Sequence, residues 1–326
     1  ASGAAPAPFQ SGGDCATPVR WQATSRQLWA LPVVHSGGAK TPRLLCSSGS
    51  RVTDVYGLND VLGSGAYGCV RQVTSQKTGD IRAAKFVSRQ AAAKGAAALR
   101  REAEMLLRLD HPSIVRFVEG FEDARHACLV MEFCSGGGVY NNVIKTVDFG
   151  ERHARHLFRQ LFGAVAHMHG RFVCHRDLKP SNLMLQHNGP ILQNTLVIID
   201  FGLAVQFSPG KPILRAAGTP PFCAPQVFER RYGPECDLWS AGCVLYLLMT
   251  GNLPFKGRTP AELREKVAGR MCDMSGESWR GISEEARALT LALLEVDPGK
   301  RCSAQAGLVH PWVVAREPVN TGSGEL

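Results

Sequence analysis

The stretch HRDLKPSN, residues His175–Asn182, points most directly to the fold of this chain. It places a carboxylate (Asp177), an ammonium group (Lys179) and an amide (Asn182) within one short loop. In that arrangement the carboxylate can orient an attacking hydroxyl and accept its proton, while the ammonium neutralises a transferring phosphoryl group. The amide can help to hold a metal ion. The loop therefore indicates phosphoryl-transfer chemistry.

Downstream of this loop, a second metal carboxylate follows an apolar strand-like run at Leu196–Ile199. The sequence DFG begins there at Asp200, next to the flexible Gly202. Mg²⁺ is commonly bound through one or two side chains together with the phosphates of a substrate. Asn182 and Asp200 are therefore the predicted metal ligands.

Upstream, the glycine-rich stretch GSGAYGCV at Gly63–Val70 lies between two strand-like runs. Glycines let backbone N–H groups approach a polyphosphate closely. A dinucleotide-binding fold shares such a motif, but there a helix follows the glycines. Here Cys69–Val73 continues as a strand, which favours a phosphate-covering loop between strands.

Lys85 lies on the next strand-like run, Ile81–Val87, which places a cation under the glycine loop. Glu102, on the helical pattern that follows, can hold that lysine in place. Taken alone, this pair could be a surface lysine and a surface glutamate. The motifs occur in an order and at spacings that let them converge, which excludes chance as an explanation.

From about Asp54 to Trp312 the chain resembles eukaryotic protein kinases, and most closely the calcium/calmodulin-dependent group, in particular calcium-dependent protein kinases without their EF-hand part. The motifs that carry this resemblance are Asp54–Tyr56, Leu129–Glu132 and Asn194–Leu203. The resemblance implies an α+β, bilobal fold with ATP in the cleft. It implies a small antiparallel β lobe with one main helix over about 54–133 and a larger, mostly helical lobe over about 134–314. Residues 1–53 are then a flexible extension, and residues 315–326 a short tail.

The resemblance also implies which residues bind ATP. Met131 is then the gatekeeper, Glu132 and Cys134 offer backbone groups to adenine, and other apolar side chains enclose its ring. The implied ATP-binding residues are Leu62, Gly63, Gly65, Gly68, Val70, Ala83, Lys85, Met131, Glu132, Cys134 and Met184. The implied stack linking the lobes is Leu106, Phe117, His175 and Phe201, anchored by Asp237. For the apolar positions an ordinary core role is equally valid.

Two further motifs bear on the hydroxyl that is modified. Lys179, two residues after Asp177, and the sequence Gly218–Pro220 follow the Ser/Thr pattern of the family. Thr219 would then bond both Asp177 and Lys179. The implied activity is ATP- and Mg²⁺-dependent phosphorylation of Ser/Thr hydroxyls in protein substrates.

Departures from the family pattern qualify this interpretation. Gln226 replaces the usual glutamate that pairs with a late arginine, here Arg301, so a buried cation loses its charged partner. Relatives that select arginine before the target residue carry glutamates where this chain has Gly138, Ser181 and Leu247. We therefore expect weak or no preference for arginine upstream of the target.

The activation segment, residues 203–223, has no Asp or Glu, and only Ser208 and Thr219 carry hydroxyls. The position that many kinases phosphorylate falls on Arg215, which leaves Arg176 without an evident phosphate partner. We expect activity without phosphorylation there, with Ser208 as a weaker candidate switch. No EF-hand pattern occurs, so either calcium control is absent or a regulatory domain lies outside this chain.

The amino-acid composition bears on the protein's partners, its compartment and its relation to membranes. The formal net charge of +9 is spread along the chain, which does not predict a nucleic-acid partner. The 11 cysteines form no C-x-x-C pair and predict free thiols in a reducing, cytoplasmic setting. No run reaches the roughly 18 apolar residues of a membrane span. The expected partners are protein substrates and a calcium-sensing protein or domain, and the expected state is a monomer. Trp21 and Trp29 could pack on the folded domain or mark a partner-binding segment.

Helical periodicity predicts the main helices of the second lobe at Glu151–His169, Cys236–Thr250, Thr259–Arg270 and Ser283–Glu295.

Two other functions stay open. One is a pseudokinase scaffold that keeps the fold, supported by Gln226 and by the unusual segment Gly136–Tyr140. The other is a small-molecule phosphotransferase on a kinase-like fold, which the protein-substrate motifs at Gly218–Pro225 disfavour.

Overall fold

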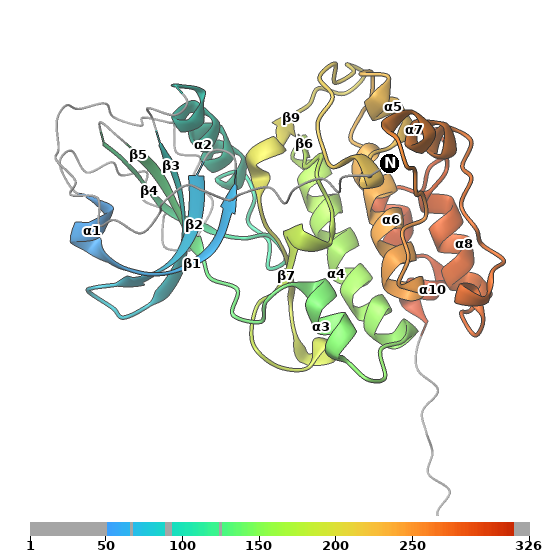
Figure 1. Cartoon of the computed structure of the whole chain (residues 1–326), viewed down its shortest axis with the longest axis horizontal. Helices are drawn as coiled ribbons and strands as arrows, with labels where there is room; N and C mark the ends of the chain where they lie inside the picture. The colour runs from blue at the N-terminus through green and yellow to red at the C-terminus, as the bar shows by residue number, and fades with distance from the viewer. Residues whose placement is uncertain (1–50, 66–67, 89–92, 124–125, 316–326) are drawn as a thin grey trace, which may run out of the picture.

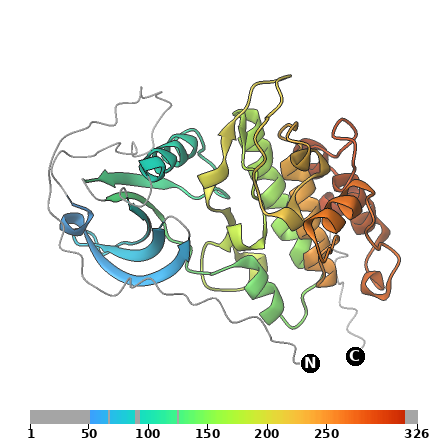
Figure 2. The same ribbon diagram turned by 45° about the horizontal axis from the view of Figure 1, so that its top comes forward.

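The computed structural model of the chain describes residues 51–65, 68–88, 93–123 and 126–315. Of the predicted extension over residues 1–53, residues 1–50, with Trp21 and Trp29, lie outside the described residues, and Val52 and Thr53 lie in the short helix α1 (Val52–Val55). Of the predicted tail over residues 315–326, only Ala315 is described. A sheet with helix α2 forms one part of the molecule, and a mainly helical part lies beside it (Figures 1 and 2). The α+β, bilobal architecture predicted from the sequence is therefore confirmed.

The small lobe is built on an antiparallel sheet whose strand order is β1-β2-β3-β5-β4. The short helix α1 (Val52–Val55) precedes the strands β1 (Tyr56–Gly65), β2 (Gly68–Ser75), β3 (Ile81–Ser88), β4 (Phe117–Glu122) and β5 (His126–Glu132). The turn that joins β2 to β3 contains Gly79, which takes a φ of 74°, a conformation that favours glycine. This order places Lys85 on the central strand, with Val70 and Leu129 as its strand neighbours.

Helix α2 (Ala93–Leu106) packs against this sheet (Figure 1). Its alanine-rich sequence has high helix propensity. Leu99, Ala103 and Leu106 are buried at helical spacing and form its inner face. Glu102 lies among them with 3% of its surface exposed, so this face also directs a carboxylate toward the sheet.

The large lobe consists mainly of helices with short strands between them. Its helices are α3 (Val139–Lys145), α4 (Glu151–Gly170), α5 (Pro225–Phe228), α6 (Cys236–Thr250), α7 (Pro260–Ala268), α8 (Glu284–Leu293), α9 (Ala304–Leu308) and α10 (Pro311–Val314). Its strands are β6 (Val173–Cys174), β7 (Leu183–Leu185), β8 (Leu196–Ile198) and β9 (Val205–Gln206). Strand β6 pairs with β9, and β7 pairs with β8, so these pairs frame the loops on which the predicted site lies.

Helix α6 lies at the centre of the large lobe. Every residue from Cys236 to Leu248 is buried, as expected for a helix that is apolar all round. Its bounds are those predicted, and Gly251 ends it in the left-handed conformation at a φ of 70°. The first turn therefore holds Asp237 fully buried beneath the catalytic loop, residues 175–182.

The other predicted helices are found with slightly different ends. Helix α7 is shorter than predicted because the Thr259 hydroxyl accepts a hydrogen bond from Glu262 N and Pro260 starts the helix. Ser283 caps α8 in the same way, by accepting from Ala286 N. Among the described residues, no helix has the length and apolar character needed to cross a membrane.

Candidate active site

The glycine-rich turn connects β1 to β2. Gly63 lies opposite Val70, and Gly65 lies opposite Gly68. A Cβ at Gly68 would overlap the carbonyl oxygen of Phe86 on β3, so the close approach of β2 to β3 requires glycine at this position. Residues 66 and 67 at the tip lie outside the described residues.

The residues predicted to enclose adenine come from both lobes. Ala83 lies opposite Met131 in the β3–β5 pair, and Met184 on β7 bridges to Gly138 at the start of α3. Met131 and Cys134 are buried, whereas Leu62 on β1 is 47% exposed. These side chains therefore lie on the strands and the connector that border the junction of the lobes.

Glu132 at the end of β5 and Cys134 in the connector after it are the residues predicted to offer backbone groups to adenine. Glu132 N donates to Arg116 O at 3.0 Å, and the Glu132 carboxylate pairs with Arg116 at 2.6 Å. The N–H of Cys134 has no hydrogen-bond partner among the described residues. Burial raises the pKa of the Cys134 thiol to about 11, so this side chain stays neutral at physiological pH. A donor in an otherwise apolar setting suits the edge of a nitrogen heterocycle.

Lys85, Glu102 and Asp200 form an ion cluster from β3, α2 and the start of the DFG turn. Lys85 Nζ lies 2.8 Å and 3.0 Å from the two oxygens of Glu102, and 2.7 Å from Asp200 Oδ1. Burial alone would lower the pKa of Lys85, but its pairing with the two carboxylates outweighs burial and raises it. The cluster therefore holds a charged ammonium between the lobes.

Asp200 differs from Glu102 in its surroundings. Burial raises the pKa of Glu102, whose side chain is 2% exposed. Burial would also raise the pKa of Asp200, but the charge of Lys85 outweighs it and keeps that pKa below its usual value. The Asp200 side chain is 45% exposed, so one ionised carboxylate of the cluster is accessible to solvent.

The catalytic loop joins Asp177, Lys179 and Thr219 in one hydrogen-bonded group. Lys179 Nζ lies 2.7 Å from Asp177 Oδ2 and donates to Thr219 Oγ1 at 2.8 Å. The Thr219 hydroxyl donates to Asp177 Oδ1 at 2.7 Å. Asn182 Nδ2 donates to the backbone oxygen of Asp177 at 2.9 Å. The bonds predicted for Thr219 are thus present in the structure.

Gly218 makes this approach of Thr219 possible. Its φ is 117°, and a Cβ there would lie 2.6 Å from Arg176 O and 3.0 Å from Cys223 Sγ. Only glycine combines that conformation with such close packing. The segment that carries Thr219 is therefore held directly against the catalytic loop.

Asp237 anchors the catalytic loop from below. Its carboxylate accepts hydrogen bonds from His175 N at 2.9 Å and from Arg176 N at 2.8 Å. His169 Nε2 lies 2.9 Å from the same carboxylate, and these partners keep the Asp237 pKa below its usual value although burial would raise it. The His175 ring packs edge-on against Phe201 at 4.8 Å, which ties this loop to the DFG turn.

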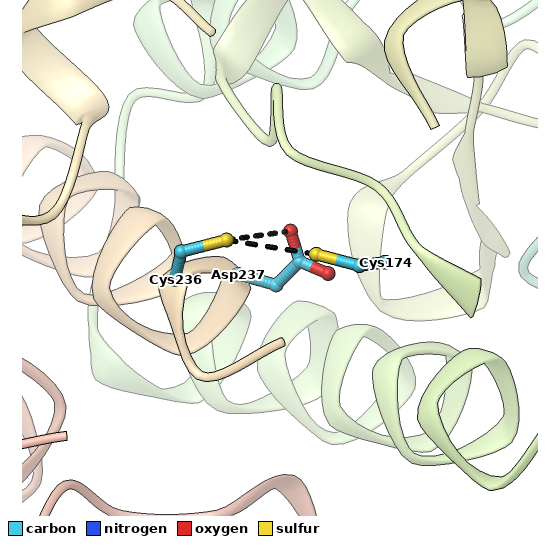
Figure 3. Close-up of side chains that lie close together, drawn as sticks. All are labelled: Cys174, Cys236 and Asp237. Atoms are coloured by element: carbon cyan, nitrogen blue, oxygen red, sulfur yellow. Dashed lines mark hydrogen bonds between the residues drawn. The ribbon is translucent and has the colours of Figure 1, made fainter. Parts of the chain in front are cut away.

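Cys174 and Cys236 flank this carboxylate and have their sulfur atoms 3.5 Å apart (Figure 3). Together with Asp237 they form a buried group with the side-chain types of a metal site. Burial holds the pKa of the Cys174 thiol well above its usual value, and Asp237 is already committed to the catalytic loop. In this structure the two thiols pack around the carboxylate that holds residues 175 and 176.

Gln226, which stands where the family has a glutamate, contacts Arg301 near the start of α6. Arg301 Nη2 donates to Gln226 Oε1 at 3.0 Å, and the guanidinium also donates to the backbone oxygens of Glu295 and Glu235. Within the described part of the chain no carboxylate pairs with Arg301, and burial lowers its pKa to about 10. Gln226 thus retains the hydrogen bond but not the charge.

The unusual glycine segment after β5 has a packing role. A Cβ at Gly136 would overlap His187 O and lie 2.7 Å from the Leu185 side chain. Gly136 N donates to Leu185 O, and Leu185 N donates to Gly137 O. The segment pairs closely with β7, and this packing explains its composition.

Some residues of the site carry no motif that the sequence could reveal. His169 ends α4 and reaches Asp237, and Tyr232 follows α5 and reaches Arg176. Both contacts join residues far apart in the sequence, so only the folded chain brings them together. A histidine and a tyrosine outside the known motifs gave no signal of these contacts.

Comparison with known proteins gives one family match. The protein kinase domain matches residues 56–313. The chain is 37% identical over 261 residues to calcium-dependent protein kinase 3 of Plasmodium berghei, which covers 79% of this chain and 47% of that protein. It is 38% identical over 273 residues to calcium-dependent protein kinase 9 of Oryza sativa, with 82% and 47% covered.

A third relative is covered over more of its length. The chain is 34% identical over 279 residues to a probable myosin light chain kinase of Dictyostelium discoideum, covering 85% of this chain and 70% of that protein. The chain spans about half the length of the calcium-dependent kinases that it matches. The resemblance seen in the sequence motifs is thereby confirmed.

Proposed function

Because the chain belongs to the protein kinase domain family, we propose that it is an ATP- and Mg²⁺-dependent kinase that phosphorylates Ser/Thr hydroxyls of protein substrates. The observation that carries this proposal is the hydrogen-bonded group of Asp177, Lys179 and Thr219. Asp177 and Lys179 lie on the same loop as Asn182, and the ion cluster of Lys85 lies across the junction of the lobes.

Asp177 is the proposed base. Its Oδ2 faces Lys179 and its Oδ1 faces the Thr219 hydroxyl, which shows that this carboxylate accepts a hydroxyl hydrogen bond at 2.7 Å. A substrate hydroxyl presented to the same carboxylate would be oriented, and its proton would have an acceptor. Lys179 would offset the negative charge that develops during transfer.

The donor atoms present suit the proposed cofactors. Asp200 is ionised and partly exposed, and Asn182 commits its amide nitrogen to Asp177, which leaves its amide oxygen for a cation. Carboxylate and amide oxygens are the ligands that Mg²⁺ prefers. Lys85 would hold phosphate oxygens of ATP, the Cys134 N–H would meet adenine, and ATP with its metal would supply the phosphoryl group and the charge neutralisation.

We test the activity by incubating the chain with γ-labelled ATP, Mg²⁺ and a mixed protein substrate, followed by phosphoamino-acid analysis. Label on serine or threonine supports the proposal. Label on tyrosine alone, or no label from a chain that still binds ATP, contradicts it. The second of these results would favour the non-catalytic scaffold.

The substrate preference is a further part of the proposal. Gly138, Ser181 and Leu247 offer no carboxylate to a basic substrate, and Leu247 is buried in α6 with 8% exposed. We expect little selection for arginine upstream of the target. A peptide array with strong selection for arginine two or three residues before the target would contradict this expectation.

A further inference from the structure

Arg176 contacts the activation segment at two separate points. Its Nε donates to Leu203 O at 2.7 Å, at the beginning of the segment. Its Nη1 donates to Arg215 O at 3.2 Å, just past the middle of the segment. The backbone N of Arg176 donates to the buried Asp237 carboxylate, so the arginine that binds the segment is itself held in place.

Tyr232 completes this contact from outside the segment. Its hydroxyl accepts from Arg176 Nη1 at 3.3 Å and donates to Arg215 O at 2.7 Å. Arg176, Arg215 and Tyr232 therefore form a closed ring of hydrogen bonds. The tyrosine is 5% exposed, and burial raises its pKa, so it remains a neutral donor at physiological pH.

The backbone of Tyr232 strengthens the same connection. Ile213 N donates to Tyr232 O at 2.7 Å, and Tyr232 N donates to Ile213 O at 3.2 Å. This antiparallel bridge fixes the chain just before Arg215 to the connector between α5 and α6. The segment is thus held by backbone bonds and by a buried side chain at adjacent positions.

A phosphate is the alternative way to hold such an arginine, because it adds charge and strong acceptors. No hydroxyl is available to carry a phosphate at this position, since Arg215 occupies it, and no acidic residue of the segment supplies a negative charge instead. Carbonyl oxygens and a phenol hydroxyl supply the acceptors instead. These acceptors are present without any modification.

We propose that Tyr232 is a positioning residue that holds the activation segment in place for substrate through Arg176 and Arg215, and that this hold needs no phosphate. The inference rests on the proposed kinase activity for its functional consequence. The hold itself is a structural property and can be measured separately.

The experiment compares Tyr232→Phe with Tyr246→Phe. Tyr246 is a matched control, because it is also a buried tyrosine, and its hydroxyl donates to one backbone oxygen, Asp273 O, at 2.7 Å. We expect Tyr232→Phe to lower kcat for a peptide substrate about tenfold, as for a lost buried hydrogen bond, with the KM for ATP unchanged. Tyr246→Phe is expected to keep kcat within about twofold.

A second readout does not depend on activity. Hydrogen exchange of residues 213–217 should become faster in Tyr232→Phe and not in Tyr246→Phe. Unchanged exchange there overturns the inference, even if the chain transfers no phosphate. Equal losses of kcat in the two variants would also overturn it, because they would reflect stability alone.

Treatment with a broad-specificity protein phosphatase completes the test. The intact mass confirms that phosphate has been removed, and the wild-type chain is expected to keep its activity. Loss of activity after this treatment would show that a phosphate is required and would overturn the inference. Absence of transfer from the untreated chain would instead contradict the proposed function.

Discussion

Arg301 is a buried cation whose side-chain acceptor, Gln226, is neutral. Its guanidinium is 6% exposed, and its partners are the amide of Gln226, backbone oxygens and the Trp239 ring at 5.2 Å. Burial lowers its pKa to about 10, so the charged form is destabilised in the folded chain. A carboxylate at position 226 would reverse that effect.

We predict that Gln226→Glu stabilises the chain by about 1–3 kcal/mol, because an ion pair with Arg301 replaces a hydrogen bond from the guanidinium to a neutral amide, and this gain outweighs the lost bond from Gln226 Nε2 to Val296 O. The measurement is urea unfolding at pH 7. Gln226→Ala serves as the opposite control and should destabilise the chain, because it removes the side-chain acceptor of Arg301 and the bond from Gln226 Nε2 to Val296 O. A Gln226→Glu chain that is no more stable than wild type would contradict the prediction.

The glycine-rich turn allows a second residue-scale prediction. Gly68→Ala should destabilise the chain by about 2–4 kcal/mol, because its Cβ would overlap Phe86 O and force β2 and β3 apart. Gly63→Ala is the matched control, since no atom lies within 4 Å of a Cβ at that position. Thermal unfolding of both variants without nucleotide is the measurement. Similar melting temperatures of the two variants would contradict the close approach of β2 to β3 at Gly68.

The contacts within the predicted catalytic group were the most predictable part of the site. The motifs named Asp177, Lys179 and Thr219, because their chemistry requires those side chains at a fixed spacing. The contact between Lys85 and Asp200 joins residues 115 positions apart, so it depends on how the lobes close and not on local spacing. Tyr232 was missed for the same reason.

At the scale of elements, Glu151 connects the beginnings of three helices. Its carboxylate on α4 accepts from Ser283 N at 2.7 Å, from Ser283 Oγ at 2.6 Å and from Trp312 Nε1 at 2.6 Å. Burial would raise the pKa of Glu151, but these hydrogen bonds outweigh burial and lower it. The ionised form therefore stabilises the junction of α4, α8 and α10.

We predict that Glu151→Gln lowers the free energy of unfolding by about 1–3 kcal/mol at pH 7. Glu284→Gln, at an exposed glutamate 3.8 Å from Arg287, is the control and should change little. Because the pKa of Glu151 is lowered, its contribution is present above its usual value of 4.5 and is lost as the pH falls below it. The difference between Glu151→Gln and wild type should therefore shrink in acid; a constant difference would contradict this.

Element boundaries were predictable where local chemistry sets them. Helix α6 has the predicted bounds because its apolar run ends at Gly251. Helix α7 was predicted too long, because Thr259 caps the helix from outside and Gly269 follows its last turn. Strands β6 and β9 have two residues each and form through their pairing, so no periodicity could reveal them.

For the whole molecule, one contact between the lobes contributes to the pH dependence of stability. The His111 ring, after α2, lies 5.1 Å from the His167 ring on α4. Burial lowers the pKa of His167 to about 4, and the charges of Arg171 and His111 act in the same direction. Asp110 acts against them. His167 is therefore neutral in the folded chain near neutral pH.

We predict that the melting temperature falls as the pH decreases from 6.5 to about 4, because the unfolded chain takes up a proton at His167 before the folded chain does. His167→Gln, which cannot titrate, should show a shallower decline. The measurement is thermal unfolding of both chains at several pH values across this window. Parallel curves of melting temperature against pH in the two chains would contradict the lowered pKa of His167.

The central claim is that Asp177 acts as the base in phosphoryl transfer from ATP to a protein hydroxyl. The most direct measurement compares wild type with Asp177→Asn for Mg²⁺-dependent transfer from labelled ATP, with and without a calcium chelator. Thermal stabilisation by ATP and Mg²⁺ serves as the binding control. We predict that transfer falls at least about 100-fold in Asp177→Asn while this stabilisation is kept. Equal transfer by both chains, or no transfer by wild type that still binds ATP, would contradict the claim.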